Sequence, residues 1–152
     1  MGAVTIDPGD EAVAAIVARI NSAITYTLPT AAAAAVQIVD PYESISGFRV
    51  DVTHEDETQL YETLALEDAS SHILRIWIRD KLADGAAATL MSRKLLTRKI
   101  FQRINEYVTS DKRCSVWEAG QARNEHPGKQ WVVKDGLYVA FIELRVEVRP
   151  PA

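Results

Sequence analysis

Hydrophobic and polar residues alternate near the end of the chain in a pattern that predicts a long β-hairpin. Its arms, residues 131–134 and 137–149, are joined by Asp135-Gly136. An Asp-Gly pair between two apolar runs is a strong hairpin signal, because a type I′ turn requires φ > 0 at both central residues. The second arm is roughly twice the mean length of a strand. Either the domain's own sheet or another copy of the protein must therefore pair with its backbone.

Side chains of the second arm alternate between apolar and polar, so its two faces are expected to differ in burial. The residues expected on the buried face are Tyr138, Ala140, Ile142, Leu144, Val146 and Val148. The residues expected on the opposite face are Glu143, Arg145, Glu147 and Arg149.

Apolar residues recur at helical spacing in two other segments. The first helix is expected over residues 10–23, with Asp10 as its N-cap. The second is expected over residues 90–108, and residues 81–89 predict a mobile linker before it. The buried stripe of the second helix is expected to contain Leu96, Ile100, Ile104 and either Tyr107 or Val108.

Period-two alternation predicts further strands before and between the helices. They are expected at residues 36–39, from Gly47 onward, at residues 73–79 and at residues 114–117. Their core-facing residues are expected to include Phe48, Val50, Val52, Leu74, Ile76 and Ile78. The acidic residues 55–68 are expected to form a loop or short helix, and residues 119–129 a loop.

The order of these elements favours an α+β fold. Helices and strands do not alternate one for one, so we expect a mostly antiparallel sheet of four to five strands. The two main helices would pack on one face of this sheet, and the long hairpin would close it. A chain of 152 residues corresponds to one domain, and residues 1–9 and 150–152 are expected to be flexible ends.

Composition excludes several classes of function. The net charge of -4 and the pI of about 5.4 argue against a general nucleic-acid binder. A single cysteine excludes an intrachain disulfide, and no apolar run approaches the roughly 20 residues of a membrane span. The first residues lack the pattern of a signal peptide. We therefore expect a protein that is made in the cytoplasm and used or assembled there.

No pattern of catalytic or metal-binding residues is recognisable. Asp51, His54, Glu55, Asp56 and Glu57 are of the residue types that bind metals. They match no HExxH or EF-hand spacing, so a solvated acidic segment is favoured and no metal site is predicted. The histidines His54, His72 and His126 have no nucleophile in a recognisable local motif. Cys114 is expected to be a buried structural cysteine, and neither enzymatic activity nor a cofactor is predicted.

Five cations lie close together on the second predicted helix. They are Arg93, Lys94, Arg98, Lys99 and Arg103. This basic helix face could be solvated, could pair with residues 55–68 of the same chain, or could bind the acidic segment of a neighbouring copy. The last is preferred for an oligomer, because complementary charge determines register and orientation. The other candidate interface residues are Glu55, Asp56, Glu57, Glu143, Arg145 and Glu147.

The order of elements resembles the tail terminator, or tail completion, proteins of tailed phages. The shared pattern is an amphipathic helix, two strands, a third strand, a long helix after a short linker, and a closing hairpin. Here the third strand reads Leu74-Arg75-Ile76-Trp77-Ile78-Arg79. The resemblance covers about residues 10–149, and residues 55–68 and 119–129 depart from the family's pattern.

This resemblance implies a structural protein of the virion rather than an enzyme. It would form a homo-oligomeric ring, commonly a hexamer, at the neck between head and tail. Its partners would be the tail tube protein and the head–tail connector or adaptor proteins, with DNA only passing through the lumen. Alternatives are another neck or head–tail adaptor protein, a monomeric adaptor that binds a partner's strand, or a small α+β enzyme or ligand-binding domain. The enzyme would use His54 or His72 as a base.

Overall fold

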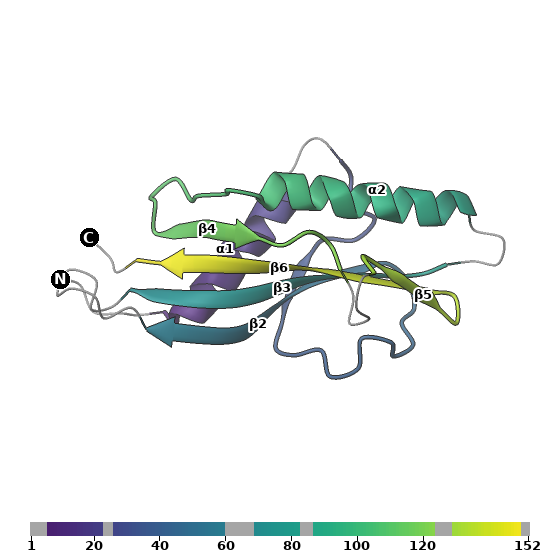
Figure 1. The fold of residues 1–152 in the computed structure, drawn as a ribbon, viewed down its shortest axis with the longest axis horizontal. Coiled ribbons are helices and arrows are strands. Elements are labelled where there is room, and N and C mark those ends of the chain that lie inside the picture. The colour runs from purple at the N-terminus through teal and green to yellow at the C-terminus, as the bar shows by residue number, and fades with distance from the viewer. Residues whose placement is uncertain (1–5, 23–25, 60–68, 83–86, 124–128, 150–152) are drawn as a thin grey trace.

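The computed structural model describes residues 6–22, 26–59, 69–82, 87–123 and 129–149. In chain order, its helices and strands are α1 (Pro8–Asn21), β1 (Ala33–Ala35), β2 (Arg49–Gln59), β3 (Ser70–Lys81), α2 (Ala87–Ile104), β4 (Cys114–Ala119), β5 (Val132–Lys134) and β6 (Leu137–Val148). Figure 1 shows them in an elongated molecule whose strands run along its long axis. Within the described residues, no helix combines the length and apolar character needed to cross a lipid bilayer.

The strands form one mixed sheet in the order β1-β2-β3-β6-β4, and β5 also pairs with β6. All neighbours are antiparallel except β1 and β2, which are parallel. The expected α+β fold with a mostly antiparallel sheet is therefore confirmed. The sheet has six strands rather than four to five. β5 is the predicted first arm of the hairpin, whereas β1 was not predicted.

The Asp135-Gly136 turn has the backbone that its sequence requires. Asp135 has φ 53° and Gly136 has φ 75°, so both central residues are left-handed, as in a type I′ turn. Leu82 donates its backbone N–H to the carbonyl of Gly136 at 2.6 Å. This contact ties the end of β3 to the hairpin.

β6 is a central strand with partners on both edges. Along its whole length it pairs with β3, from Ser70 opposite Val148 to Lys81 opposite Leu137. Its other edge pairs with β4 and β5. Between the segments of β6 that pair with β4 and β5, Phe141 forms an isolated bridge with Arg123. Of the two sources of backbone partners considered for this strand, the domain's own sheet is therefore the one that the structure shows.

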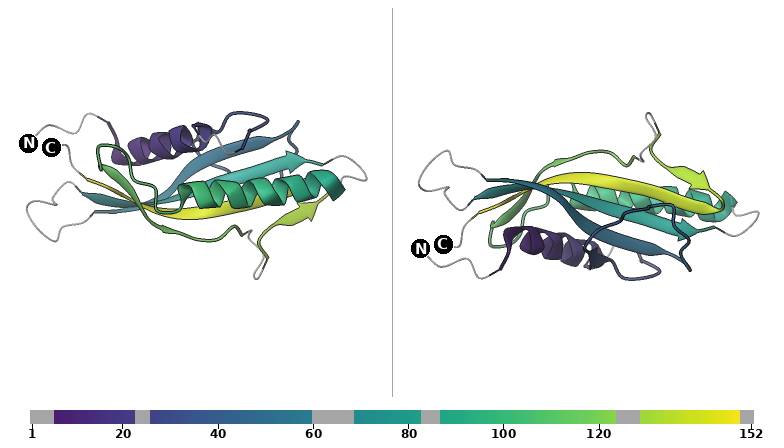
Figure 2. Two further views of the ribbon diagram at one scale, coloured as in Figure 1. Left: turned by 90° about the horizontal axis from the view of Figure 1, so that it is seen from above. Right: turned by 90° about the horizontal axis from the view of Figure 1, so that it is seen from below.

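The main hydrophobic core lies between the sheet and the two helices. Both helices contribute to it, α1 with Val13, Ile16 and Ile20, and α2 with Leu96, Ile100 and Ile104. The sheet contributes the alternate residues that the sequence predicted, Phe48, Val50, Val52, Leu74, Ile76, Ile78, Tyr138, Ala140, Ile142, Leu144, Val146 and Val148. Two views along the sheet show α1 and α2 running beside the strands (Figure 2).

A second, smaller cluster covers part of the opposite face of the sheet. Ile45 packs there with Trp77, Leu137, Val139 and Phe141. The segment between β1 and β2 crosses this face in the view from below (Figure 2). The strand expected at residues 36–39 is therefore absent, since this segment serves as a cover and the edge strand is formed by the preceding alanines.

The ends of both helices differ from the prediction by a few residues. α1 begins at Pro8, two positions before Asp10, because Asp7 is the N-cap and its carboxylate accepts from the backbone N–H of Asp10 at 3.1 Å. Residues 8 and 9 are therefore helical rather than part of a flexible end. α2 begins at Ala87, within the expected linker, and ends at Ile104. Glu106 then adopts a φ of 60°, which stops the helix before Tyr107 and Val108.

The first part of the acidic segment, residues 55–59, is also a strand rather than a loop or helix. β2 continues to Gln59, which pairs with Ser70, and a bulge between His54 and Asp56 shifts the register.

Other expectations lie wholly or partly outside the described residues. They concern the ends at 1–5 and 150–152, the acidic residues 60–68, the linker residues 83–86 and the loop residues 124–128 with His126.

The turn provides a direct test of this fold. Replacing Gly136 by alanine adds a Cβ to a left-handed residue and places it 3.3 Å from the carbonyl oxygen of Leu82. We expect the Gly136→Ala variant to lose about 1–2 kcal/mol of unfolding free energy in urea denaturation. Gly47→Ala is the matched control, because its added Cβ meets nothing within 4 Å. Equal stabilities of the two variants would contradict the assigned turn.

Candidate functional sites: a charged sheet face and a histidine cluster

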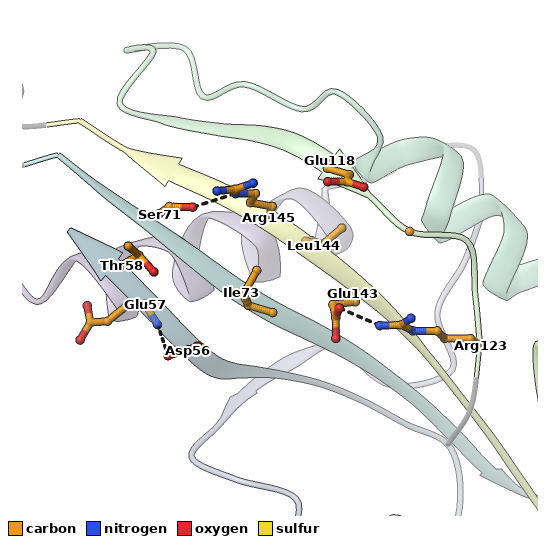
Figure 3. Close-up of a pocket in the computed structure, with 11 residues that line it drawn as sticks. Asp56, Glu57, Thr58, Ser71, Ile73, Glu118, Arg123, Glu143, Leu144 and Arg145 are labelled. Carbon is orange, nitrogen blue, oxygen red and sulfur yellow. Dashed lines mark hydrogen bonds and ion pairs between the residues drawn. The ribbon is translucent and has the colours of Figure 1, made fainter. Parts of the chain in front are cut away.

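The uncovered part of the open sheet face forms a charged groove (Figure 3). It has a volume of about 280 Å³ and is lined from β2, β3, β6 and the end of β4. Its residues of either charge are Asp56, Glu57, Glu118, Arg123, Glu143 and Arg145. Two of the lining residues, Ile73 and Leu144, are apolar. The groove therefore offers a mixed surface to a partner rather than an enclosed cavity.

Glu143 is the centre of an ion-pair network beside this groove. Its carboxylate accepts from Arg75 at 3.1 Å and from Arg123 at 2.7 Å. Both guanidinium groups also lie over the ring of Phe141, at 4.5 Å and 5.4 Å from its centroid. The aromatic ring and the two ion pairs hold the arginines against the sheet. The network presents a preorganised pattern of charge on the open face.

The other two candidate residues of β6 differ in exposure. Arg145 is exposed and donates to the hydroxyl of Ser71 at 3.1 Å (Figure 3). Glu147 points away from the main core as predicted, but it is only 7% exposed and accepts from Arg149 at 3.3 Å. Of these two, only Arg145 therefore presents its charge to a partner.

The basic face of α2 is partly used within the chain. Arg93 donates to Asp80 at 2.5 Å and lies over the ring of Phe48, and the ammonium group of Lys94 lies 4.9 Å from the centroid of Trp131. Arg98 is exposed, whereas Lys99 and Arg103 are half-buried. Among the described residues, no ion pair joins α2 to the acidic end of β2, so the pairing of these two segments within one chain receives no support.

Exposed apolar residues accompany the charges of α2. Met91 and Leu95 are 70% and 54% exposed, and with Lys94 and Arg98 they line a shallow hollow on the helix. Val36 and Val39, which directly follow β1, are also exposed. In Figure 1, α2 runs along one long side of the molecule, and the segment after β1 lies on the other, beyond β2.

A histidine cluster lies where β2 meets β3 on the helix-covered face. Nε2 of His54 is 2.9 Å from Nδ1 of His72, and Nε2 of His72 is 2.6 Å from the hydroxyl of Ser70. Glu57 approaches the same Nδ1 of His72 at 3.8 Å. The bulge after His54 places Glu57 opposite His72. His54 and Glu57 therefore lie on the same face of the sheet, although an odd number of positions separates them along β2.

Burial dominates the electrostatics of this cluster. His72 is fully buried, and this desolvation lowers the pKa of its imidazole, with the neighbouring His54 acting in the same direction. The carboxylates of Glu57 and Asp7 oppose the shift. His54 packs against the first turn of α1, where a Cβ on Gly9 would lie 2.7 Å from its Cε1. The glycine therefore leaves room for the ring.

Asp51 does not join the histidines, although the sequence placed it with His54 as a possible metal ligand. It lies on the opposite face of β2 and accepts from Arg79 at 3.3 Å and from Arg49 at 3.3 Å. Both Asp51 and Arg79 are buried, at 3% and 1% exposure. Their carboxylate and guanidinium therefore form a structural ion pair beneath the segment that crosses this face.

Cys114 is placed as predicted, as a buried cysteine at the start of β4. Burial raises the pKa of its thiol to about 11, and the nearby carboxylates of Glu11 and Asp111 add to the rise. A thiol of this kind is almost entirely protonated near neutral pH, so it is unsuited to act as a nucleophile.

The convergence of His54, Glu57 and His72 was not predicted from the sequence. Part of the signal was present, because His72 has the same parity as Leu74 and Ile76, which were assigned to the core face. The other part, the bulge that turns Glu57 toward His72, depends on the pairing of β2 with β3. It has no sequence pattern of its own.

No protein-family model matches this chain, and no curated protein matches its sequence. The geometry and charge distribution above, together with the resemblance in the order of elements, are the basis of the function proposed below.

The buried pair of Asp51 and Arg79 gives a prediction for stability. Asp51→Ala leaves the Arg79 guanidinium buried without its closest partner, so we expect a loss of about 3–5 kcal/mol of unfolding free energy. Arg49→Ala removes the half-exposed partner of the same carboxylate, and we expect a loss below about 1 kcal/mol. Urea denaturation measures both. Similar losses in the two variants would show that burial of Arg79 does not matter.

The thiol of Cys114 gives a prediction for reactivity. At pH 8, we expect a disulfide reagent to modify the native thiol on the order of a hundredfold more slowly than the thiol of the urea-unfolded chain. The physical reasons are the raised pKa and the burial of the sulfur atom. Absorbance of the released chromophore follows the reaction. Comparable rates in the two states would contradict the placement of Cys114 in the core.

Proposed function

We propose that this chain is a structural protein of a tailed-phage virion that assembles into a ring at the neck. There it would terminate the tail tube and connect it to the head connector. The order of elements supports this reading by resemblance. The observation that carries it is the distribution of charge: the acidic end of β2 and the helix α2, which carries the basic residues, lie on opposite sides of the molecule (Figure 1).

Two different complementary surfaces on opposite sides favour a head-to-tail interface. Such an interface produces a ring when its rotation closes. The acidic side contributes Glu55, Asp56 and Glu57, all exposed, and the basic side contributes Arg98. Opposite charges at such a contact set its register and increase the rate of association.

Exposed apolar residues on the same two sides add the contact area that charges alone do not provide. Met91 and Leu95 lie on the basic side, and Val36 and Val39 lie beside β1. Val36 is 97% exposed. Apolar side chains gathered on a surface and bordered by charge are typical of interaction sites.

The proposed contact uses side chains rather than an extended sheet. The backbone of β6 is already paired on both edges. The exposed edge of β2 beyond His54 carries a bulge and three acidic residues, and both features disfavour strand addition. A ring of this chain would therefore be held by charges and apolar contacts between separate sheets.

Three partners follow from the proposal. The chain would bind copies of itself, in a ring that is commonly hexameric in the resembling family, as well as the tail tube protein and the head–tail connector or adaptor proteins. DNA would only pass through the lumen. The groove beside Glu143, with its charges of both signs, is a second surface for one of these neighbours. The protein would occur in the virion and, during assembly, in the host cytoplasm.

The enzyme alternative receives less support from the same structure. It would place a histidine base in a cleft between the sheet and α2. His54 and His72 lie instead beside the first turn of α1, and the groove on the open face is lined by neither histidine. A different neck adaptor with the same kind of surface remains the nearest alternative role.

A charge exchange across the proposed interface tests this function. We expect Arg98→Glu and Glu55→Lys each to weaken self-association about tenfold or more at low salt, because each places like charges together. The loss should shrink at high salt. The double variant with both exchanges should recover much of the association. Sedimentation velocity of the purified protein at several concentrations measures the oligomer population.

Lys81→Glu is the matched control, since it changes the net charge as Arg98→Glu does, and Lys81 is exposed at the end of β3, outside both proposed contact surfaces. We expect it to leave the oligomer population unchanged. A wild-type protein that remains monomeric at every concentration and salt would contradict a preformed ring. A double variant that associates no better than the two single variants would contradict the proposed pairing of α2 with β2.

A further inference from the structure

Three side chains with metal-binding atoms converge at the bulged end of the β2–β3 pair. Ligand atoms of His54, Glu57 and His72 all lie within 4.8 Å of one another. We propose that these residues form a binding site for one divalent transition-metal ion of the zinc type. One ligand, Glu57, also belongs to the acidic side of the proposed interface, but the existence of the metal site does not depend on the proposed phage function.

The backbone creates this convergence through one irregularity. In a regular strand, His54 and Glu57 would point to opposite faces. The extra residue Glu55 shifts the register, so that Glu57 pairs with His72 and Asp56 pairs with Ile73. In Figure 3, Glu57 accordingly extends away from the groove residues around Glu143. The bulge therefore brings the Glu57 carboxylate near His72, although Glu57 also borders the groove, and leaves Asp56 on the open face.

The donor set corresponds to a known class of metal chemistry. Two imidazoles and one carboxylate are the protein ligands of one group of zinc sites with an open fourth position. Around a tetrahedral zinc ion, ligand atoms at about 2.0–2.1 Å from the metal lie roughly 3.3 Å from one another. The nitrogen atoms of His54 and His72 are 2.9 Å apart, and the nearer oxygen of Glu57 lies 3.8 Å from His72. All three ligand atoms lie within 4.8 Å of one another, so a bound ion would require the half-exposed Glu57 side chain to move toward the histidines.

Ser70 supplies the outer contact that such a histidine needs. Its hydroxyl lies 2.6 Å from Nε2 of His72. When Nε2–H donates to this hydroxyl, the lone pair of Nδ1 points toward His54 and Glu57. A hydrogen bond from the second ring nitrogen is the usual way to fix the orientation and tautomer of a metal-bound histidine. Both Ser70 and His72 are buried, so the orientation is held by packing.

The surroundings allow a cation to enter and favour its charge. Glu57 is 49% exposed at its side chain, whereas His72 is fully enclosed, so the cluster opens toward solvent on the Glu57 side. Asp7 is a second carboxylate beside His54, next to the position that a Cβ of Gly9 would occupy. Solvent would supply the fourth ligand. The ion would then link β2 to β3 beside the first turn of α1.

The same donor set selects among metals. Imidazole nitrogen suits Zn²⁺, Co²⁺, Ni²⁺ and Cu²⁺. Mg²⁺ and Ca²⁺ prefer oxygen ligands in larger numbers than this cluster provides. We therefore expect Zn²⁺ and Co²⁺ to bind and Mg²⁺ not to compete with them.

The test uses the untagged full-length protein, stripped with a chelator and dialysed. Co²⁺ titration followed by visible absorption is expected to show saturable binding of one ion per chain, with bands typical of low coordination number. Zn²⁺ should then displace Co²⁺ and abolish these bands, and millimolar Mg²⁺ should leave them unchanged. Absence of saturable binding, a different stoichiometry, or displacement by Mg²⁺ would overturn the proposal.

Two variants show whether these residues are the ligands. Glu57→Gln and His54→Gln are expected to weaken Zn²⁺ binding at least about tenfold. Asp56→Asn is the matched control, because it removes the neighbouring carboxylate on the other face, and it should bind as the wild type does. Glu57 is half exposed, so Glu57→Gln keeps the fold, which circular dichroism verifies. Wild-type affinity in Glu57→Gln and His54→Gln would overturn the assignment.

Discussion

The antiparallel ladder between β3 and β6 is the interaction on which the other features of this structure depend. It runs without interruption from Ser70 opposite Val148 to Lys81 opposite Leu137. Both strands are central in the sheet, so their backbone groups have partners on two sides. Because side chains alternate along each strand, this one register decides which residues meet the helices and which face the open side. A slip by one residue would move Leu74, Ile76 and Ile142 out of the core.

Both functional regions follow from that register. On the open side it places Arg75 opposite Glu143 and Trp77 opposite Phe141, which builds the ion pairs over an aromatic base. On the helix side it carries His72 into the layer of Leu74 and Ile76, where burial leaves the ring dependent on Ser70, His54 and Glu57 for its polar contacts. The open face is therefore suited to binding other proteins, and the covered face to a small enclosed polar site.

Local patterns predicted the parts of the fold that local physics determines. The Asp135-Gly136 turn, the stripe Leu96–Ile100–Ile104 and the alternation of Leu74, Ile76 and Ile78 all require only short stretches of sequence, and all were confirmed. What escaped prediction depends on distant partners. The alanines of β1 form a strand only because β2 lies alongside. Likewise, Arg79 is buried only because the segment before β2 crosses its face, where Glu43 and Asp51 approach it.

The candidate interface was predicted as a set of charged residues. The structure shows which of them are exposed and which are engaged within the chain. Arg93 and Glu147 are engaged within the chain, whereas Arg98, Arg145 and the acidic end of β2 are exposed. No periodicity could have shown this, since exposure of a charge depends on which side chains of other elements lie over it. The elements α2 and β2, which carry exposed charges, lie on opposite sides of an elongated domain (Figure 1), an arrangement that suits the proposed head-to-tail ring.

Electron microscopy of the purified protein mixed with phage tail tubes tests the proposed role at the tail end most directly. The account predicts closed rings of one size, each seated on one end of a tube. Tubes with bare ends, or protein that remains as separate single domains beside them, would contradict it.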